Sequence, residues 1–352
     1  MSVLTYKCPN CGGSLIFQPK TQQYACEYCL SEFDQTALDA STPEADSHVN
    51  EDAALHEEVP QEEEISLYTC PSCGAQIAAD PTTAATFCYY CHNPIVLFGQ
   101  LSGDQMPSHI VPFQITKEEA KEQFLAWIRG KTYLPPAFYS PAQIERLSGI
   151  YFPYWTLDCT LQADLHTTAR DLRVWRSHDT EYTETKTYAI HRLGEISLKE
   201  LTRNALQKSQ GRMLEGILPF DLKKAQPFRP SFLSGFQAEV KDLEKETFLQ
   251  SLKEETDCYA KSLLSHTITS HQHLTTDSFR TYNVQHKWHY TLLPVWILTY
   301  QHQQETYYFA MNGQTGEICG RLPIHMRKLV FTCASIFAAI TAGITLLGGL
   351  LL

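Results

Sequence analysis

The chain has 352 residues and a formal net charge of −11. The negative charge is concentrated between Asp34 and Glu64, where eleven acidic residues stand without a lysine or arginine, and the rest of the chain balances 28 acidic against 28 basic residues. This balance argues against a protein that binds nucleic acid through a basic surface, because such binding depends on Lys and Arg that neutralise phosphates.

Eight of the twelve cysteines form two copies of one pattern, in which two CxxC pairs are separated by 14 residues. The second copy repeats the first at an offset of 62 residues, including the flanking Tyr, Pro and Gly. Two such pairs can close on one tetrahedral metal ion, while the residues between them form a hairpin. The pattern predicts a tandem pair of zinc ribbons, with the ligands Cys8, Cys11, Cys26 and Cys29 in the first and Cys70, Cys73, Cys88 and Cys91 in the second.

Soft thiolate ligands favour zinc, with iron as a weaker alternative. A segment of this size buries too little apolar surface to fold alone, so we expect each structural ion to supply about 10–16 kcal/mol of folding free energy. Two disulfide knots or a redox-active CxxC pair are the rival interpretations, but they require an oxidising compartment or a thioredoxin-like βαβ context. Four thiolates per site leave no open position, which indicates structural rather than catalytic zinc.

The segments around the ribbons predict an α+β fold. We expect the first ribbon at residues 1–33, an acidic disordered linker at 34–64, the second ribbon at 65–98 and an α+β cytosolic body at 99–328. The linker is rich in like charges and poor in large apolar residues, a composition that favours a solvated tether.

Helices are predicted in two parts of the body. Thr116 and Glu119 form a capping box for a helix over about 117–129, and Gly130 follows its end. Helical spacing returns between 241 and 264, with a predicted apolar face of Phe248, Leu252, Tyr259 and Leu263.

Strands are predicted between and after these helices. Apolar residues alternate with polar ones from Leu157 to Leu165, which predicts a strand with one solvated face. A second strand is expected within 180–193. Gly313 and Gly316 predict a hairpin turn in which both adopt positive φ. Three further strands are predicted at 284–290, 292–301 and 306–311.

The C-terminal segment 329–352 contains 24 residues without a charge, enough to cross a bilayer as a single helix. The alternative is a buried core helix, but a soluble helix of this length usually carries a polar face. Arg327 and Lys328 precede the segment, so the positive-inside rule places residues 1–328 in the cytoplasm. The N-terminus lacks the pattern of a signal peptide. We therefore expect a single-pass protein of the cell membrane.

Catalytic signatures are missing or defective. Gly130-Lys131-Thr132 resembles the end of a phosphate-binding loop, but Leu125 occupies the position that requires glycine. The sequence has no GxSxG, HExxH or GxGxxG motif. We therefore predict no catalytic residues and no enzymatic activity. The remaining cysteines are expected to be packing residues: Cys159, Cys258, Cys319 and Cys333.

Six histidines gather in the C-terminal third and could form a second kind of metal site. Polar strand faces explain them better, since no cysteine or carboxylate cluster accompanies them. These histidines are His266, His271, His273, His286, His289 and His302.

The ribbons carry little charge of their own. The first ribbon holds Lys7 and Lys20 against Glu27 and Glu32, and the second contains no Lys or Arg. Binding of nucleic acid by these ribbons is therefore not expected.

The tandem CPxCG ribbons, the segments GIYFPYWTLD and LPVWILTY, and YYFAMNGQTGEICGRLPI ahead of an apolar C-terminus resemble the bacterial TFIIB-type zinc-ribbon membrane proteins. The resemblance extends over nearly the whole chain. It implies an adaptor that accompanies flotillin-type (SPFH) and phage-shock-protein-A-type proteins in membrane stress. Some relatives are labelled primosomal helicases, but only the eight ribbon cysteines correspond to those labels here.

The leading hypothesis is a non-enzymatic, membrane-tethered adaptor that recruits protein partners through its ribbons. A nucleic-acid-binding protein of replication or transcription type is the alternative. An enzyme whose site lies in the body is a third hypothesis and rests on no motif.

Overall fold

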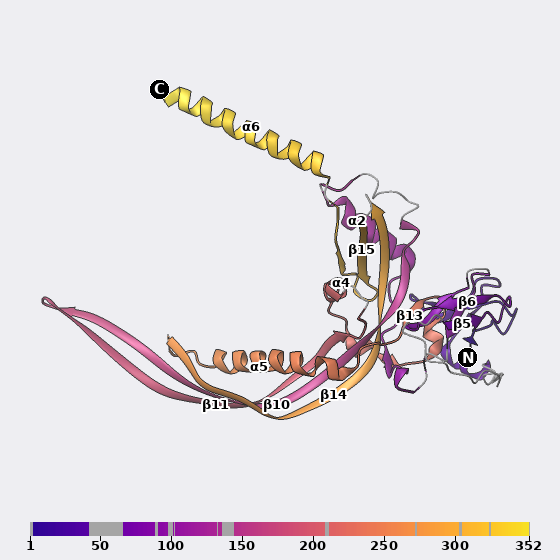
Figure 1. Cartoon of the computed structure of the whole chain (residues 1–352), viewed down its shortest axis with the longest axis horizontal. Coiled ribbons are helices and arrows are strands. Elements are labelled where there is room, and N and C mark those ends of the chain that lie inside the picture. The colour runs from indigo at the N-terminus through magenta and orange to yellow at the C-terminus, as the bar shows by residue number, and fades with distance from the viewer. Residues whose placement is uncertain are drawn as a thin grey trace, which may run out of the picture. The chain divides into compact units, whose positions relative to one another are not determined.

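The protein is described by a computed structural model (Figure 1), and its fold is α+β, with two N-terminal four-cysteine clusters and one C-terminal apolar helix, as predicted. The chain divides into two compact units. Unit 1 comprises residues 1–153, 206–240 and 292–352, and unit 2 comprises residues 154–205 and 241–291. The structure describes residues 3–41, 66–88, 91–97, 101, 103–131, 133–135, 144–207, 211–271, 273–302, 305–323 and 325–351.

The two cysteine-rich segments are built from short strands. The strands of the first segment are β1 (Val3–Leu4), β2 (Leu15–Gln18), β3 (Gln23–Cys26) and β4 (Glu32–Phe33). Those of the second are β5 (Ser66–Thr69), β6 (Gln76–Ala79), β7 (Thr83–Phe87) and β8 (Pro94–Leu97). Strands β2, β3 and β4 form one small sheet, and β5 pairs with β6 in another.

Strands β7 and β8 belong to the main sheet of unit 1 and not to a separate module. Val3 of β1 pairs with Leu97 of β8, and Ala85 of β7 pairs with Ala238 of β13 (Gln237–Glu239). Strand β13 in turn runs parallel to β10 (Ser148–Ser177). The strand order of the main sheet therefore continues from the second cysteine-rich segment, through β7 and β13, into β10 of the predicted body.

The other side of this sheet is formed by β14 (His273–His302), β15 (Glu305–Asn312) and β16 (Ile318–Gly320), which are antiparallel neighbours. Helix α2 (Lys117–Arg129) begins at the predicted capping box and buries Ala120, Phe124 and Ile128. The remaining elements of unit 1 are short: α1 (Gln35–Ser41), β9 (His109–Ile110), α4 (Gly211–Glu215), β12 (Gln226–Pro227), and 3-10 turns at Gly103–Gln105, Leu222–Lys224 and Pro230–Leu233.

An aromatic cluster fills the core of unit 1. Phe113 stacks on Phe236 with ring centroids 4.3 Å apart, and both rings meet Tyr151 edge-on. The indole N–H of Trp296 donates to the Ile115 carbonyl at 3.1 Å. Gly313 lies directly against this cluster, because a Cβ there would come within 2.6 Å of the Phe113 ring.

Unit 2 consists of the outer parts of β10 and β14, strand β11 (Thr180–Asn204) and helix α5 (Leu249–His266), which a 3-10 turn at Lys245–Phe248 precedes. Strand β10 lies between β11 and β14. Helix α5 runs along these strands in Figure 1, and its Leu252, Ala260 and Leu264 join one hydrophobic core with the inward-facing residues of β10. The alternation predicted for residues 157–165 is confirmed and continues to residue 169.

Three of the predicted strands are parts of longer strands in the structure. The strand predicted at 157–165 is part of the 30-residue β10, and the strands predicted at 284–290 and 292–301 form the single strand β14. Only Thr291 separates those two runs, and it is buried, with its Oγ1 3.2 Å from Oγ1 of Thr156. A β-branched residue does not provide a turn, so the strand continues.

The predicted face of the second helix was wrong in part. Leu252 is buried, but Tyr259 and Leu263 are exposed, and the buried row continues instead through Thr256, Ala260 and Leu264. The side chains of Thr256 and Ala260 are small, so they allow the helix to pack closely against the strands. A side chain as large as that of tyrosine would not fit between the helix and the strands.

The acidic linker and the turn glycines also needed correction. Residues 35–41 form α1, because the Asp34 carboxylate accepts hydrogen bonds from the Ala37 N–H and the Thr36 hydroxyl, both at 2.8 Å. The predicted linker residues 42–64 lie outside the described residues.

In the turn after β15, Gly316 has φ +83°, as predicted, but Gly313 is not in the left-handed region. A glycine is required at position 313 because of its close packing.

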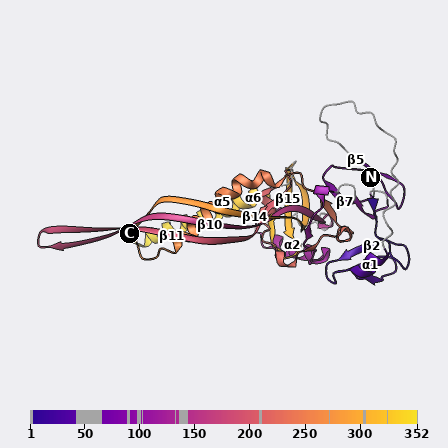
Figure 2. The same ribbon diagram turned by 90° about the horizontal axis from the view of Figure 1, so that it is seen from below.

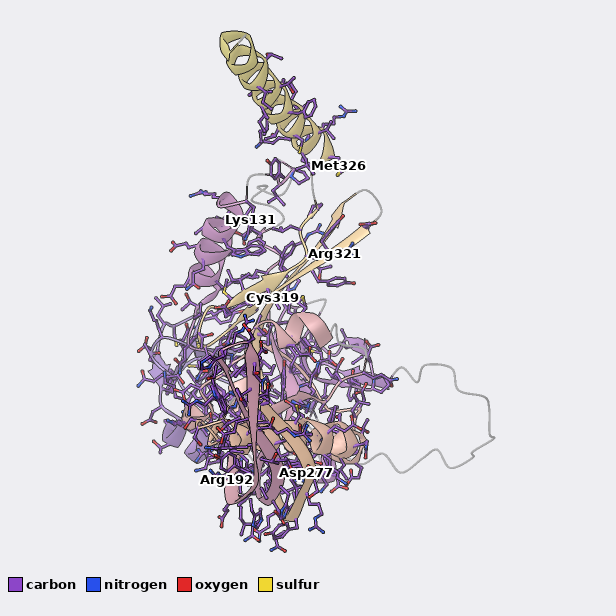
Figure 3. All side chains as sticks on the ribbon, turned by 90° about the vertical axis from the view of Figure 1, so that its left-hand side faces the viewer. Lys131, Arg192, Asp277, Cys319, Arg321 and Met326 are labelled. Carbon is purple, nitrogen blue, oxygen red and sulfur yellow. The ribbon has the colours of Figure 1, made fainter. Side chains whose placement is uncertain are left out.

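The C-terminal helix α6 (Met326–Leu351) includes a stretch, Met326–Thr345, that is long and apolar enough to cross a membrane and is not buried against the rest of the protein. Figure 3 shows its side chains standing free beyond the labelled Met326. The helix starts three residues before the predicted span, so Arg327 and Lys328 lie in its first turn.

The packing at Gly313 gives a prediction for stability. The change Gly313→Ala should destabilise unit 1 by about 1–3 kcal/mol, because the added methyl group would contact Phe113 and the Pro294 carbonyl oxygen at 2.9 Å. Urea unfolding of the detergent-solubilised chain, followed by tryptophan fluorescence, measures this. Gly130→Ala is the matched control, since its Cβ would meet only an ordinary contact of 3.5 Å. Equal stability of the two variants would contradict the prediction.

Candidate metal centres

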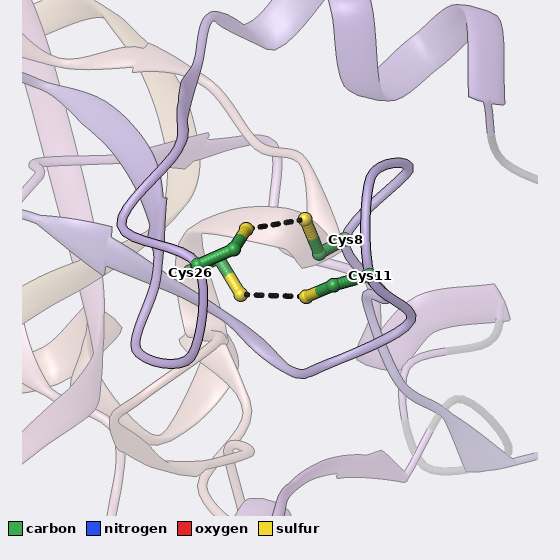
Figure 4. Close-up of side chains that lie close together, drawn as sticks. Cys8, Cys11 and Cys26 are labelled. Carbon is green, nitrogen blue, oxygen red and sulfur yellow. Dashed lines mark hydrogen bonds between the residues drawn. The ribbon is translucent and has the colours of Figure 1, made fainter.

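The first cysteine cluster brings together Cys8, Cys11, Cys26 and Cys29. Sγ of Cys8 lies 3.5 Å from Sγ of Cys29, and Sγ of Cys11 lies 3.4 Å from Sγ of Cys26 (Figure 4). Two thiolates on one tetrahedral zinc ion, each at about 2.3 Å, are about 3.8 Å apart. The sulfurs therefore have nearly the spacing that zinc requires, whereas a disulfide needs about 2.0 Å.

The second cluster has the same arrangement with Cys70, Cys73, Cys88 and Cys91. Its two closest pairs, Cys70 with Cys91 and Cys73 with Cys88, are each 3.7 Å apart. In both clusters the first cysteine of each CxxC pair is buried and the second is more exposed. All eight predicted ligands are thus collected into two plausible four-cysteine metal sites.

All four CxxC pairs share one backbone turn. The N–H of the first cysteine bonds to the carbonyl five residues later, and its own carbonyl accepts from the N–H four residues later. The residue at that fourth position has positive φ in every turn: Gly12, Leu30, Gly74 and His92. This turn points both sulfurs of a pair to the same side, which explains why the ligands converge.

The thiols of the first cluster differ in acidity. The hydroxyl and backbone N–H of Ser31 lower the pKa of Cys29 to about 6. The Gly13 backbone lowers the pKa of Cys11, but hydrogen bonding with the Cys26 and Cys29 thiols outweighs it and raises that pKa to about 12. Cys29 therefore ionises more readily than Cys11, and binding of a cation by the full set must release protons.

Two thiols of the second cluster have a raised pKa. Burial raises the pKa of Cys91 to about 12. The Ala75 backbone lowers the pKa of Cys73, but burial and the Cys88 and Cys70 thiols outweigh it and raise that pKa. A divalent cation must displace these protons before four thiolates can bind it, so we expect metal affinity at both clusters to fall at acidic pH.

The first cluster is fixed to the rest of unit 1 through strands β2 and β3. The Tyr24 hydroxyl lies 2.8 Å from the Ser231 hydroxyl, and the Phe17 ring packs edge-on against Phe232. The backbone N–H of Phe17 donates to the Ser234 carbonyl at 3.0 Å. In Figure 2 strand β2 and helix α1 lie together, and the Gln35 side chain of α1 also contacts the Tyr24 hydroxyl.

The remaining cysteines do not behave alike. Cys159 is buried in the core of unit 2, as predicted for a packing residue, and burial raises its pKa. Cys258 and Cys333 are exposed, so the packing prediction was wrong for both. Cys258 lies on α5 but outside its buried row, and Cys333 lies on helix α6, which is not buried.

The structure also brings together three side chains that the sequence had not suggested: Asp164, His166 and His191. None belongs to the histidine group predicted in the C-terminal third. The sequence predicted strands at 157–165 and within 180–193, but it predicted neither their pairing nor their register, so the two histidines could not be placed opposite each other.

The chain is similar over nearly its full length to the uncharacterized protein YdjG of Bacillus subtilis (strain 168). The two are 27% identical over 343 residues, which cover 97% of this chain and 95% of YdjG. No protein-family model matches the chain, and no solved structure matches it.

The cluster geometry predicts the metal content of the protein. After dialysis against zinc-free buffer the full chain should retain two zinc ions, and Cys11→Ser and Cys73→Ser should each retain one, as measured by elemental analysis. Cys258→Ser is the matched control and should keep both, because this thiol is exposed and outside the clusters. Retention of two ions by Cys11→Ser would show that the first cluster does not hold zinc.

Loss of metal from the second cluster should destabilise the main sheet more than loss of metal from the first cluster does. Strands β7 and β8 are part of that sheet, so Cys73→Ser should lower the unfolding temperature of unit 1 further than Cys11→Ser does. Differential scanning fluorimetry of the two variants side by side makes the comparison. The reverse order would contradict the role given to β7.

Proposed function

We propose that the chain is a membrane-anchored, non-enzymatic adaptor. It holds two structural zinc ions in four-cysteine ribbons on the cytosolic side, spans the membrane once and recruits protein partners to the bilayer during envelope stress. The partners are flotillin-type (SPFH) or phage-shock-protein-A-type proteins, as the family resemblance implies. The proposal of a non-enzymatic role rests on the absence of a complete catalytic motif in the sequence.

Leu30 is the observation that carries this proposal. Its side chain is 81% exposed, and its backbone has φ +59°. A non-glycine residue in the left-handed region costs roughly 1–2 kcal/mol, and an exposed leucine regains none of that through burial. The CxxC turn itself requires this positive φ, as it does at Gly12, Gly74 and His92, so the feature that points to binding is an exposed leucine at a position where two of the other three turns carry glycine.

Tyr28 precedes Cys29 as Leu30 follows it, and it is exposed as well. The ring is 74% exposed but is held in place, because it lies over Gly13, where a Cβ would come 2.5 Å from its Cδ2 atom. We name Tyr28 and Leu30 the knuckle pair. A fixed, exposed apolar pair on a rigid turn has the properties of an anchor for a protein partner, since little conformational entropy is lost on binding.

The rest of the chain suits a tether better than a nucleic-acid reader. The knuckle pair carries no charge, and the first ribbon has as many acidic as basic residues. Helix α6 supplies an apolar segment of sufficient length for the anchor. Binding to nucleic acid would require a basic surface that the ribbons do not provide.

Leu30→Asn tests the knuckle pair without disturbing the turn, because Asn tolerates positive φ better than Leu does. The variant should keep two zinc ions but lose about tenfold in affinity for an SPFH-type or phage-shock-protein-A-type partner, since truncation of a binding anchor typically costs about 1–2 kcal/mol. Crosslinking in native membranes followed by quantitative mass spectrometry measures the loss.

His92→Asn is the matched control, because His92 occupies the equivalent position of the second ribbon and also has positive φ. This variant should recover the same partners as the wild type. Identical partner lists for Leu30→Asn and the wild type would refute docking through the knuckle pair. Retention of DNA or RNA by the purified chain at physiological salt would favour the nucleic-acid alternative.

The anchor gives a separate prediction. A chain that ends at Pro323 should move to the soluble fraction, whereas the full chain should resist carbonate extraction, because only the latter contains the apolar helix. A protease added to intact cells should spare an N-terminal tag if residues 1–328 face the cytoplasm. Digestion of that tag in intact cells would invalidate the proposed orientation.

A further inference from the structure

A third group of metal-binding side chains lies in unit 2, far along the sequence from both ribbons. Asp164 and His166 belong to β10, and His191 belongs to β11. Nε2 of His191 is 2.8 Å and Nε2 of His166 is 3.2 Å from the same Asp164 oxygen, Oδ1. Three possible ligand atoms from two strands therefore meet at one point.

The strand pairing explains why they meet. His166 and His191 are direct partners in the antiparallel register of β10 and β11. Asp164 precedes His166 by two residues, so its side chain leaves the strand on the same face. Cross-strand partners have Cβ atoms about 4.5–5.5 Å apart, a separation that two imidazoles can bridge through one ion.

The backbone beneath the group is rigid. Ala163 and Leu165, which alternate with Asp164 and His166 along β10, are fully buried in the core that α5 covers. The opposite face of the sheet carries the group, and there the side chains of His166 and His191 remain 45% and 54% exposed. The strand positions are thus fixed by packing, while the imidazoles can be reached from solvent.

The distances suit a tetrahedral ion. Nitrogen and oxygen ligands bind zinc at about 2.0–2.2 Å, which separates two ligands by roughly 3.3 Å. The separations of 2.8 and 3.2 Å are about 0.5 and 0.1 Å shorter than that value, and all three ligand atoms lie within 4.8 Å of one another. The imidazoles stack with centroids 4.1 Å apart and planes at 12°, so both must rotate about Cβ–Cγ to direct their lone pairs at one ion. Their exposure leaves room for this rotation.

The ligand types restrict the metal. Two imidazoles and one carboxylate favour zinc and neighbouring transition metals, whereas calcium and magnesium prefer oxygen ligands alone. Three protein ligands fill three of four tetrahedral positions, which leaves one for water or a small ligand. This composition differs from the closed four-thiolate ribbons.

One neighbouring charge acts against a cation. Nη2 of Arg280 lies 3.9 Å from Oδ2 of Asp164, the carboxylate oxygen that does not contact the histidines. The guanidinium is 75% exposed and can turn away, but it still lowers the affinity of the group for a second positive charge.

We propose that Asp164, His166 and His191 form a third site for zinc or a neighbouring divalent transition metal, which has an open coordination position and links β10 to β11. The site is independent of the proposed adaptor role, because it shares no residue with the ribbons or the knuckle pair.

Titration of the full, ribbon-loaded chain with zinc tests this site. In micromolar free zinc the wild type should bind a third ion by equilibrium dialysis and elemental analysis, and His166→Gln and His191→Gln should each stop at two. His286→Gln is the matched control, an exposed strand histidine of the same unit that lies outside the group, and it should still bind three.

Arg280→Gln provides an independent readout. Its removal should strengthen binding of the third ion by about two- to fivefold in calorimetry, because a nearby positive charge is lost. All variants should melt at the wild-type temperature when no zinc is added, since the changed side chains are on the solvent face.

Three results would overturn the proposal. The first is a wild type that binds no third ion, and the second is a third ion that persists in both His166→Gln and His191→Gln. The third is unchanged or weaker binding by Arg280→Gln, which would place the ion elsewhere.

Discussion

The pairing of β7 with β13 is the interaction on which the organisation of unit 1 depends. It joins the second cysteine cluster to β10, and through β10 to the whole main sheet. A hairpin held by four thiols is stable only when its cation is bound, because so short a segment buries little apolar surface. We therefore expect metal binding at this cluster to be coupled to the order of strands that lie far from the cysteines in sequence.

The first cluster serves a different purpose, although its turns and ligands repeat those of the second. It contacts the rest of unit 1 through Tyr24, Phe17 and the segment around Ser231. Strands β2, β3 and β4 form a separate sheet, whereas β1, which precedes the cysteines, pairs with β8 in the main one. The side of the ribbon that bears Tyr28 and Leu30 is consequently left exposed. Duplication of one motif has thus produced one copy that completes a sheet and one that offers a surface.

The sequence was sufficient for features determined by local chemistry. The eight ligands, the capping box at Thr116 and the apolar C-terminal helix all follow from spacing or composition over a few residues. It was insufficient where tertiary packing decides. The buried row of α5 uses Thr256 and Ala260 because the strands approach closely, and Gly313 is needed for contact with Phe113 and not for its φ. The histidine pair of unit 2 depends on register, which no local pattern reveals.

The two kinds of metal-binding group also bear on the compartment. Thiolates bind zinc only while they remain reduced, which favours the cytoplasm for residues 8–91. Arg327 and Lys328 at the start of α6 favour the same side by a separate physical effect, the retention of positive charge. Imidazoles and carboxylates need no reducing environment, so the group in unit 2 would bind metal on either side. The agreement between the thiols and the basic pair is therefore an argument for the proposed cytosolic orientation that does not depend on any relative.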